Sequence, residues 1–128
     1  MLLVNAWVGQ SKIHGLGLIA HEFIPSGTIV WRLAPGFDAV LSEAQLKGLS
    51  LTAQNHVQHY GYFDTRHQKY VLCAAADRFT NHSENANTRF FGDHSIAIRD
   101  IQEGEEITND YTELEKPINS RTTDRAAT

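Results

Sequence analysis

The sequence predicts a mainly β domain with one short helical insert. Short runs of β-forming residues alternate with Gly- and Pro-containing turns along most of the chain. Helical caps and spacing occur only at about residues 42–59. A length of 128 residues, 41% of them hydrophobic, fits one globular domain. We expect this domain at residues 1–116, followed by a polar tail at residues 117–128.

Charge and cysteine content narrow the classes of partner. The formal net charge is −4 and there is no run of Lys or Arg, so we expect no direct nucleic-acid partner and no membrane partner. A basic partner would complement this negative net charge better than an anionic one. Cys73 is the only cysteine, which excludes an internal disulfide and a cysteine-rich zinc site and favours a cytoplasmic location. The apolar start at residues 1–8 is short and lacks a basic region, so we expect no targeting segment.

A glycine pair, Gly15 and Gly17, follows an expected first strand at residues 2–8. Gly-x-Gly before an apolar run resembles a dinucleotide-binding fingerprint, which requires a helix of several turns. Pro25 and Gly27 come too soon for such a helix. We therefore expect a close backbone approach at the glycines, then a strand, a turn and a further strand at residues 28–33.

The helical insert has recognisable caps. Ser42 and Gln45 form a candidate capping box for a helix through Leu46 that Gly48 can end, and Ser50 or Thr52 can cap a second helix running towards His59. His56 and His59 have the i,i+3 spacing of metal ligands. Because no third ligand completes the pair, we expect no metal site.

The second half of the sequence is β-like, with strands expected at residues 60–63, 70–73, 88–91 and 95–99 and a last short segment at 107–111. Gly92-Asp93-His94 predicts a hairpin between the strands at 88–91 and 95–99. A polar run, Arg78-Phe79-Thr80-Asn81-His82-Ser83-Glu84-Asn85-Ala86-Asn87, interrupts it. Amide, imidazole and hydroxyl groups are common both in surface loops and in binding sites. The run by itself leaves both interpretations open.

Three segments follow one another in the chain: His14-Gly15-Leu16-Gly17-Leu18 with Pro25-Ser26-Gly27, Arg78-Phe79-Thr80-Asn81-His82-Ser83 closing at Asn87, and Gly104-Glu105-Glu106-Ile107-Thr108 leading to Asp110-Tyr111. In this order they resemble the SET-domain family of protein lysine methyltransferases. The resemblance spans roughly residues 8–113 and is closest to small bacterial or viral members. It implies the SET-domain (β-clip) fold of small curved sheets, with a C-terminal pseudoknot beside the Asn-His-Ser turn.

The resemblance implies a protein lysine N-methyltransferase that moves a methyl group from S-adenosyl-L-methionine to a lysine side-chain amine. Such a transfer is an in-line displacement, so catalysis depends mostly on alignment, and the amine must first become neutral. Tyr111 is the implied catalytic tyrosine. The implied cofactor contacts are His14, Gly15, Leu16, Arg78, Asn81, His82 and Tyr111.

A second aromatic residue usually lines the lysine channel in this family. Tyr60 and Tyr62 lie in the corresponding region and, with a period of two, would share one face of a strand. We prefer Tyr62, because the following Phe63-Asp64 resembles an aromatic-acid step of the family. A packing role is an equal alternative for either tyrosine.

Several departures from the family pattern affect function. Asn109 stands where the family often has Phe or Tyr controlling the number of methyl groups, which leaves product multiplicity open. No cysteine follows Tyr111, so residues such as 114–118, or the second subunit of a homodimer, would have to close the site. The expected substrate is a basic protein or peptide containing lysine. The alternative is a non-catalytic SET-like interaction module.

Overall fold

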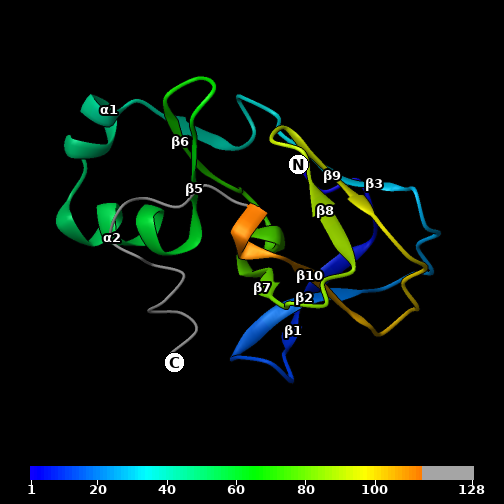
Figure 1. Ribbon diagram of the computed structural model, residues 1–128. Helices are drawn as coiled ribbons and strands as arrows, with labels where there is room; N and C mark the ends of the chain where they lie inside the picture. Colours follow the sequence, from blue (N-terminus) through cyan, green and yellow to red (C-terminus); the bar gives the residue numbers. More distant parts are fainter. Residues whose placement is uncertain (114–128) are drawn as a thin grey trace.

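Three small sheets and two short α-helices make up residues 1–113, the part of the chain that this computed structural model describes (Figure 1). The mainly β fold with one helical insert is therefore as predicted. In Figure 1 the two helices lie together on one side of the molecule, away from most of the strands. The expected domain end at residue 116 and the expected tail at residues 117–128 lie outside the described residues.

The first sheet joins the two ends of the described chain. Its strands, in spatial order, are β1 (Ala6–Gln10), β2 (Leu16–Ala20), β10 (Glu106–Asn109) and β7 (Asn81–His82). β1 and β2 form an antiparallel hairpin, and β10 pairs antiparallel with β2 but parallel with β7. The last strand therefore lies beside the Asn-His-Ser turn, as the family resemblance implied. The first strand begins at Ala6 rather than residue 2 and continues to Gln10, because Gly9 pairs with Gly17 and Gln10 with Leu16.

The other two sheets have three strands each. One contains, in spatial order, β3 (Ile29–Arg32), β9 (His94–Ala97) and β8 (Thr88–Phe90), and the other contains β4 (Ala39–Leu41), β6 (Lys69–Leu72) and β5 (Tyr62–Asp64). The predicted hairpin around Gly92 forms, with Gly92 at φ +95°. Strand β4 was not predicted. Its three residues carry little pattern of their own, and pairing with β6 defines it.

Two helices, α1 (Glu43–Lys47) and α2 (Leu51–Tyr60), occupy the predicted insert. The Ser42–Gln45 capping box is present, and Ser50 rather than Thr52 caps α2 by accepting a hydrogen bond from the Ala53 N–H. α2 extends to Tyr60 because the Gly61 N–H still donates to the Val57 carbonyl. The expectation that Tyr60 and Tyr62 share one strand face is therefore wrong.

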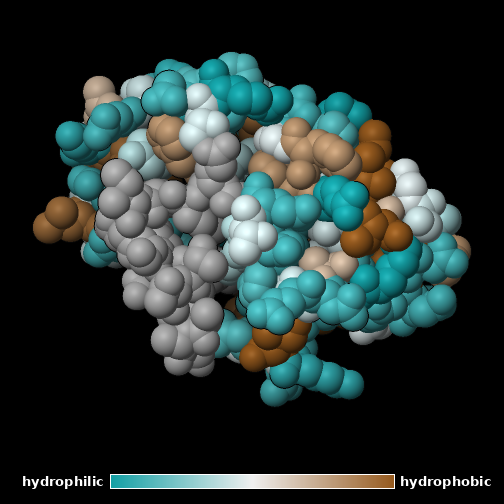
Figure 2. Space-filling model, in the orientation of Figure 1, coloured by the Kyte–Doolittle hydropathy of each residue, from teal (hydrophilic) through white to brown (hydrophobic). Residues whose placement is uncertain are grey.

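The core lies between the sheets and is closed by a bridge between Ile24 and Ile101, which are 1% and 0% exposed. Leu18 of β2 and Val71 of β6 are buried as completely. The face drawn in Figure 2 is mostly hydrophilic, with hydrophobic residues in small groups. Within residues 1–113 no helix is long and apolar enough to cross a membrane. Two further short elements are the 3₁₀ turns η1 (Ala76–Phe79), which contains Arg78, and η2 (Tyr111–Glu113), which begins at Tyr111.

Candidate active site

Asn81, at the start of β7, connects the last strand to the loop between β1 and β2 and the two glycines beside it (residues 11–17, here called the glycine-pair loop). Its side-chain N–H groups face the carbonyls of His14 (3.0 Å) and Leu16 (2.9 Å) and the Glu106 carboxylate (3.0 Å). An amide has two hydrogens, so these three acceptors already engage its donor side. Within residues 1–113 the side-chain oxygen of Asn81 makes no hydrogen bond, which leaves one acceptor for a ligand.

Glu106 is the partner that sequence reasoning missed. Its carboxylate accepts hydrogen bonds from Ser11 Oγ (2.8 and 2.9 Å) as well as from Asn81. Ser11 Oγ in turn accepts the N–H groups of Ile13 and His14. Glu106 therefore organises the whole glycine-pair loop. The Gly-Glu-Glu segment drew attention to this position without indicating a role for it.

Gly15 and Gly17 have different structural roles. Gly15 has φ +49°, and a Cβ placed there would meet nothing within 4 Å, so its backbone borders open space that a ligand can enter. A Cβ on Gly17 would instead clash with the Glu106 carboxylate and Ser11. Gly15 thus suits a ligand contact, and Gly17 permits close packing inside the protein.

Replacing Gly17 with Ala is expected to lower the free energy of unfolding by about 1–3 kcal/mol, because the new methyl group overpacks the Glu106 contact. Urea unfolding measures the change. Gly48→Ala is the matched control: Gly48 has φ −75°, nothing lies within 3.4 Å of its added Cβ, and its replacement is expected to be neutral or stabilising. Equal stability of the two variants would contradict the packing role.

His82 connects β7 to Tyr111. The backbone N–H of Tyr111 donates to His82 Nδ1 at 2.9 Å, so in the neutral ring the hydrogen is on Nε2. The two rings are 5.2 Å apart, and the His82 side chain is 30% exposed. Hydrogen bonds from the Thr112 hydroxyl and N–H lower the pKa of neighbouring Asp110. Within residues 1–113 the contacts of His82 use only Nδ1, which leaves its Nε2–H as a hydrogen-bond donor for a ligand.

A cavity of about 60 Å³ lies beside Tyr111. The Tyr111 side chain is buried, and its hydroxyl donates to the Thr80 carbonyl at 2.8 Å. Aromatic residues at the cavity are Trp31, Tyr60, Tyr62, Phe90 and Tyr111, and polar ones include Asp77, Arg78, Thr80, Thr88 and Asn109. Three predicted site residues, Tyr62, Arg78 and Tyr111, therefore meet at one cavity. Sequence reasoning had no signal for Trp31, Asp77 or Phe90.

Tyr62 is an aromatic wall of this cavity. Its ring packs edge-on against Trp31 (6.2 Å) and Phe90 (5.3 Å). Burial, with the nearby Cys73 and carboxylates, raises the Tyr62 pKa well above its usual value, so the hydroxyl stays protonated at neutral pH. Tyr60 reaches the same cavity from the end of α2, where its ring contacts His56 and His59.

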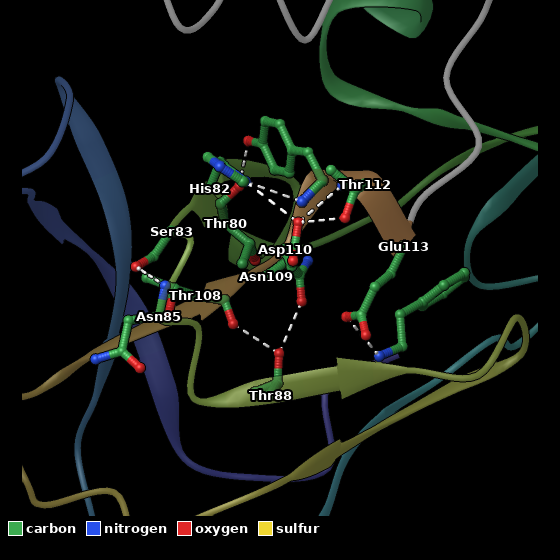
Figure 3. A network of polar contacts seen from close by, with 12 residues as sticks. Thr80, His82, Ser83, Asn85, Thr88, Thr108, Asn109, Asp110, Thr112 and Glu113 are labelled. Carbon is green, nitrogen blue, oxygen red and sulfur yellow. Dashed lines mark hydrogen bonds and ion pairs between the residues drawn. The ribbon is translucent and has the colours of Figure 1, made fainter.

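Two further cavity residues make specific contacts. Arg78 Nε donates to the Cys73 carbonyl at 3.1 Å, which holds the arginine against the cavity wall. The Thr88 hydroxyl lies 2.6 Å from the Thr108 carbonyl and 2.8 Å from the Asn109 side-chain oxygen (Figure 3). Asn109 thus places an amide, rather than an aromatic ring, at the cavity.

Comparisons with known proteins agree with this architecture. The family model of the SET domain matches residues 15–112, so the chain belongs to the SET domain family. Members of this family are generally methyltransferases. No curated protein matches the chain.

Solved structures show the same fold at low identity. An autoinhibited apo form of Polycomb Repressive Complex 2 from Chaetomium thermophilum has a TM-score of 0.69 and 18% identity over 97% of this chain. The complex bound to an inhibitor has a TM-score of 0.66 and 19% identity over 94% of this chain. This chain covers only 17% of either of those chains. A candidate histone methyltransferase of Plasmodium falciparum has a TM-score of 0.61 and 18% identity, covering 86% of this chain and 95% of its own.

Proposed function

We propose that this protein is a lysine N-methyltransferase that uses S-adenosyl-L-methionine and acts on a basic protein or peptide. The observation that carries the proposal is the buried Tyr111 hydroxyl, anchored on the Thr80 carbonyl at a cavity walled by aromatic rings. Such a cavity suits the aliphatic stem and cationic head of lysine. The family membership of the chain supports the same reaction.

The polar groups of the glycine-pair loop and β7 are suited to binding S-adenosyl-L-methionine. Open space at Gly15, the acceptor oxygen of Asn81 and the Nε2–H of His82 can together meet an amino-acid group and an adenine ring. The bound cofactor would supply a methyl group activated by a sulfonium charge. The residues of this chain align the lysine nitrogen with that methyl group, and such alignment can supply about 7–11 kcal/mol of the barrier reduction.

Calorimetry with S-adenosyl-L-methionine, followed by mass spectrometry of lysine-containing peptides, tests the proposal. We expect saturable cofactor binding and a mass increase of one or more methyl groups on lysine. Absence of cofactor binding would overturn the proposal. Binding without transfer to any basic peptide would favour the alternative, a non-catalytic SET-like interaction module, for which the amide at Asn109 is the motivating observation.

Asn109→Phe is expected to lower the highest methylation state that the enzyme produces. A phenyl ring is larger than the amide and would fill part of a cavity of about 60 Å³. Mass spectrometry of products at long reaction times measures the ratio of mono-, di- and trimethyl-lysine. Arg89→Phe, at the exposed neighbour of Thr88 in β8, is the control. An unchanged product distribution for Asn109→Phe would show that this position does not limit multiplicity.

A further inference from the structure

Two buried polar atoms within residues 1–113 lack a hydrogen-bond partner, and both belong to residues that line the Tyr111 cavity. They are Asp77 Oδ2 and Trp31 Nε1. Leaving a buried acceptor or donor unsatisfied costs free energy, so native proteins rarely do so without a function or a bound molecule. The cavity is therefore suited to a polar or charged group and not only to hydrocarbon.

Asp77 is a carboxylate with little access to solvent. It is 9% exposed, and its Oδ1 accepts the Ala75 N–H at 3.2 Å. Burial raises the pKa of Asp77; hydrogen bonding with the Cys73 thiol and the charge of the Met1 ammonium lower it in part, and the Asp38 carboxylate adds to the rise. A carboxylate of raised pKa accepts a proton more readily near neutral pH.

One short turn holds Asp77 and the Tyr111 hydroxyl at the same cavity. The Thr80 hydroxyl (2.6 Å) and N–H (3.2 Å) both donate to the Asp77 carbonyl, and the Thr80 carbonyl accepts from Tyr111. Arg78, the cation on this turn, bonds through Nε to the Cys73 carbonyl rather than to Asp77. The unpaired Asp77 oxygen and the aromatic rings of Trp31 and Tyr62, all in residues that line the cavity, favour a cation there.

We propose that Asp77 Oδ2 receives the proton that the target lysine ammonium loses before methyl transfer, an inference that rests on the proposed function. One N–H bond of the ammonium breaks, an O–H bond forms on Asp77, and the electron pair remains on nitrogen. The neutral amine then bonds to the methyl carbon while the sulfur–methyl bond breaks and its electron pair goes to sulfur. Asp77 releases the proton to solvent when the product leaves.

The pH dependence of kcat/KM for a lysine peptide tests this role. For the wild-type protein we expect a plateau across neutral pH. Asp77→Asn should lower kcat/KM about 10²-fold near pH 7, with a rise of about tenfold per pH unit towards the lysine pKa of about 10.4, because only the amine already neutral in solution can react. Asp77→Glu should restore the plateau at reduced height. Asp100→Asn should match the wild type, because Asp100 is an exposed carboxylate that, within residues 1–113, accepts a hydrogen bond only from the Ser26 N–H.

Melting temperature and cofactor affinity of each variant separate a folding defect from a lost proton acceptor. A pH profile of Asp77→Asn parallel to that of the wild type would overturn the proposal.

A metal site is the competing role for Asp77, because one possible ligand atom from each of Asp38, Cys73 and Asp77 lies within 4.8 Å of the other two. A zinc-dependent rise in melting temperature that Asp77→Asn abolishes would assign the carboxylate to a metal and also overturn the proposal. A wild-type protein that binds cofactor but transfers no methyl group would overturn the proposed function and this inference with it.

Discussion

Tyr111→Phe is expected to reduce methyl transfer by about 10²-fold or more while cofactor affinity changes only a few-fold. The hydroxyl is anchored on the Thr80 carbonyl at 2.8 Å, so its oxygen has a defined position at the cavity. Removing one pre-positioned polar group from a reacting centre typically lowers the reaction rate by about 10²-fold or more. Single-turnover transfer to a peptide measures the rate, and calorimetry measures cofactor binding.

The same substitution removes a buried hydrogen bond. Leaving the Thr80 carbonyl unsatisfied should lower the free energy of unfolding by about 1–3 kcal/mol, so activity must be measured well below the melting temperature. Tyr70→Phe is the matched control, because Tyr70 contacts Phe63 in the β5–β6 hairpin and lies outside the cavity. If both variants lost activity equally, the specific role of Tyr111 would be refuted.

Asn81→Ala is expected to destabilise the fold by about 2–4 kcal/mol, because it leaves two backbone carbonyls and the Glu106 carboxylate without their shared donor. Since these bonds hold the loop around Gly15, we also expect cofactor affinity to fall at least tenfold. Urea unfolding and calorimetry measure the two effects.

Asn85→Ala provides the control for Asn81→Ala. Asn85 belongs to the same polar run but is exposed, and only its backbone makes hydrogen bonds within residues 1–113. Its replacement should change stability by less than about 0.5 kcal/mol. A stable Asn81→Ala protein with unchanged affinity would show that the glycine-pair loop needs no tie to β7.

Local signals predicted the parts of the fold that depend on neighbouring residues. The Ser42 capping box, the Gly92 hairpin and the two helices all formed where short-range hydrogen bonds or backbone conformation define them. Strand β4 and the helical state of Tyr60 were missed, because pairing with β6 creates the first and continued helix bonding at Gly61 creates the second.

The site residues also divide into those that the sequence identified and an arrangement that only the structure shows. Three motifs in order were enough to predict the SET family and to select Asn81, His82 and Tyr111. The grouping of these residues required the tertiary structure, because β10 pairs with β7 across 27 residues of sequence, Thr108 opposite Asn81. Sequence spacing cannot specify which surfaces such long-range pairing brings together.

The amino-acid sequence by itself determined the family, the β-rich class and the residue types of the site, since these depend on motif chemistry and local patterning. Only the tertiary structure decided which of those groups are already engaged. The Asn81 amide is engaged by the glycine-pair loop, Glu106 packs against Gly17, and Asp77, which lines the Tyr111 cavity, keeps a buried oxygen without a hydrogen-bond partner within residues 1–113. Burial and hydrogen-bond satisfaction are properties of the packed chain, and they decide which polar groups remain free for chemistry.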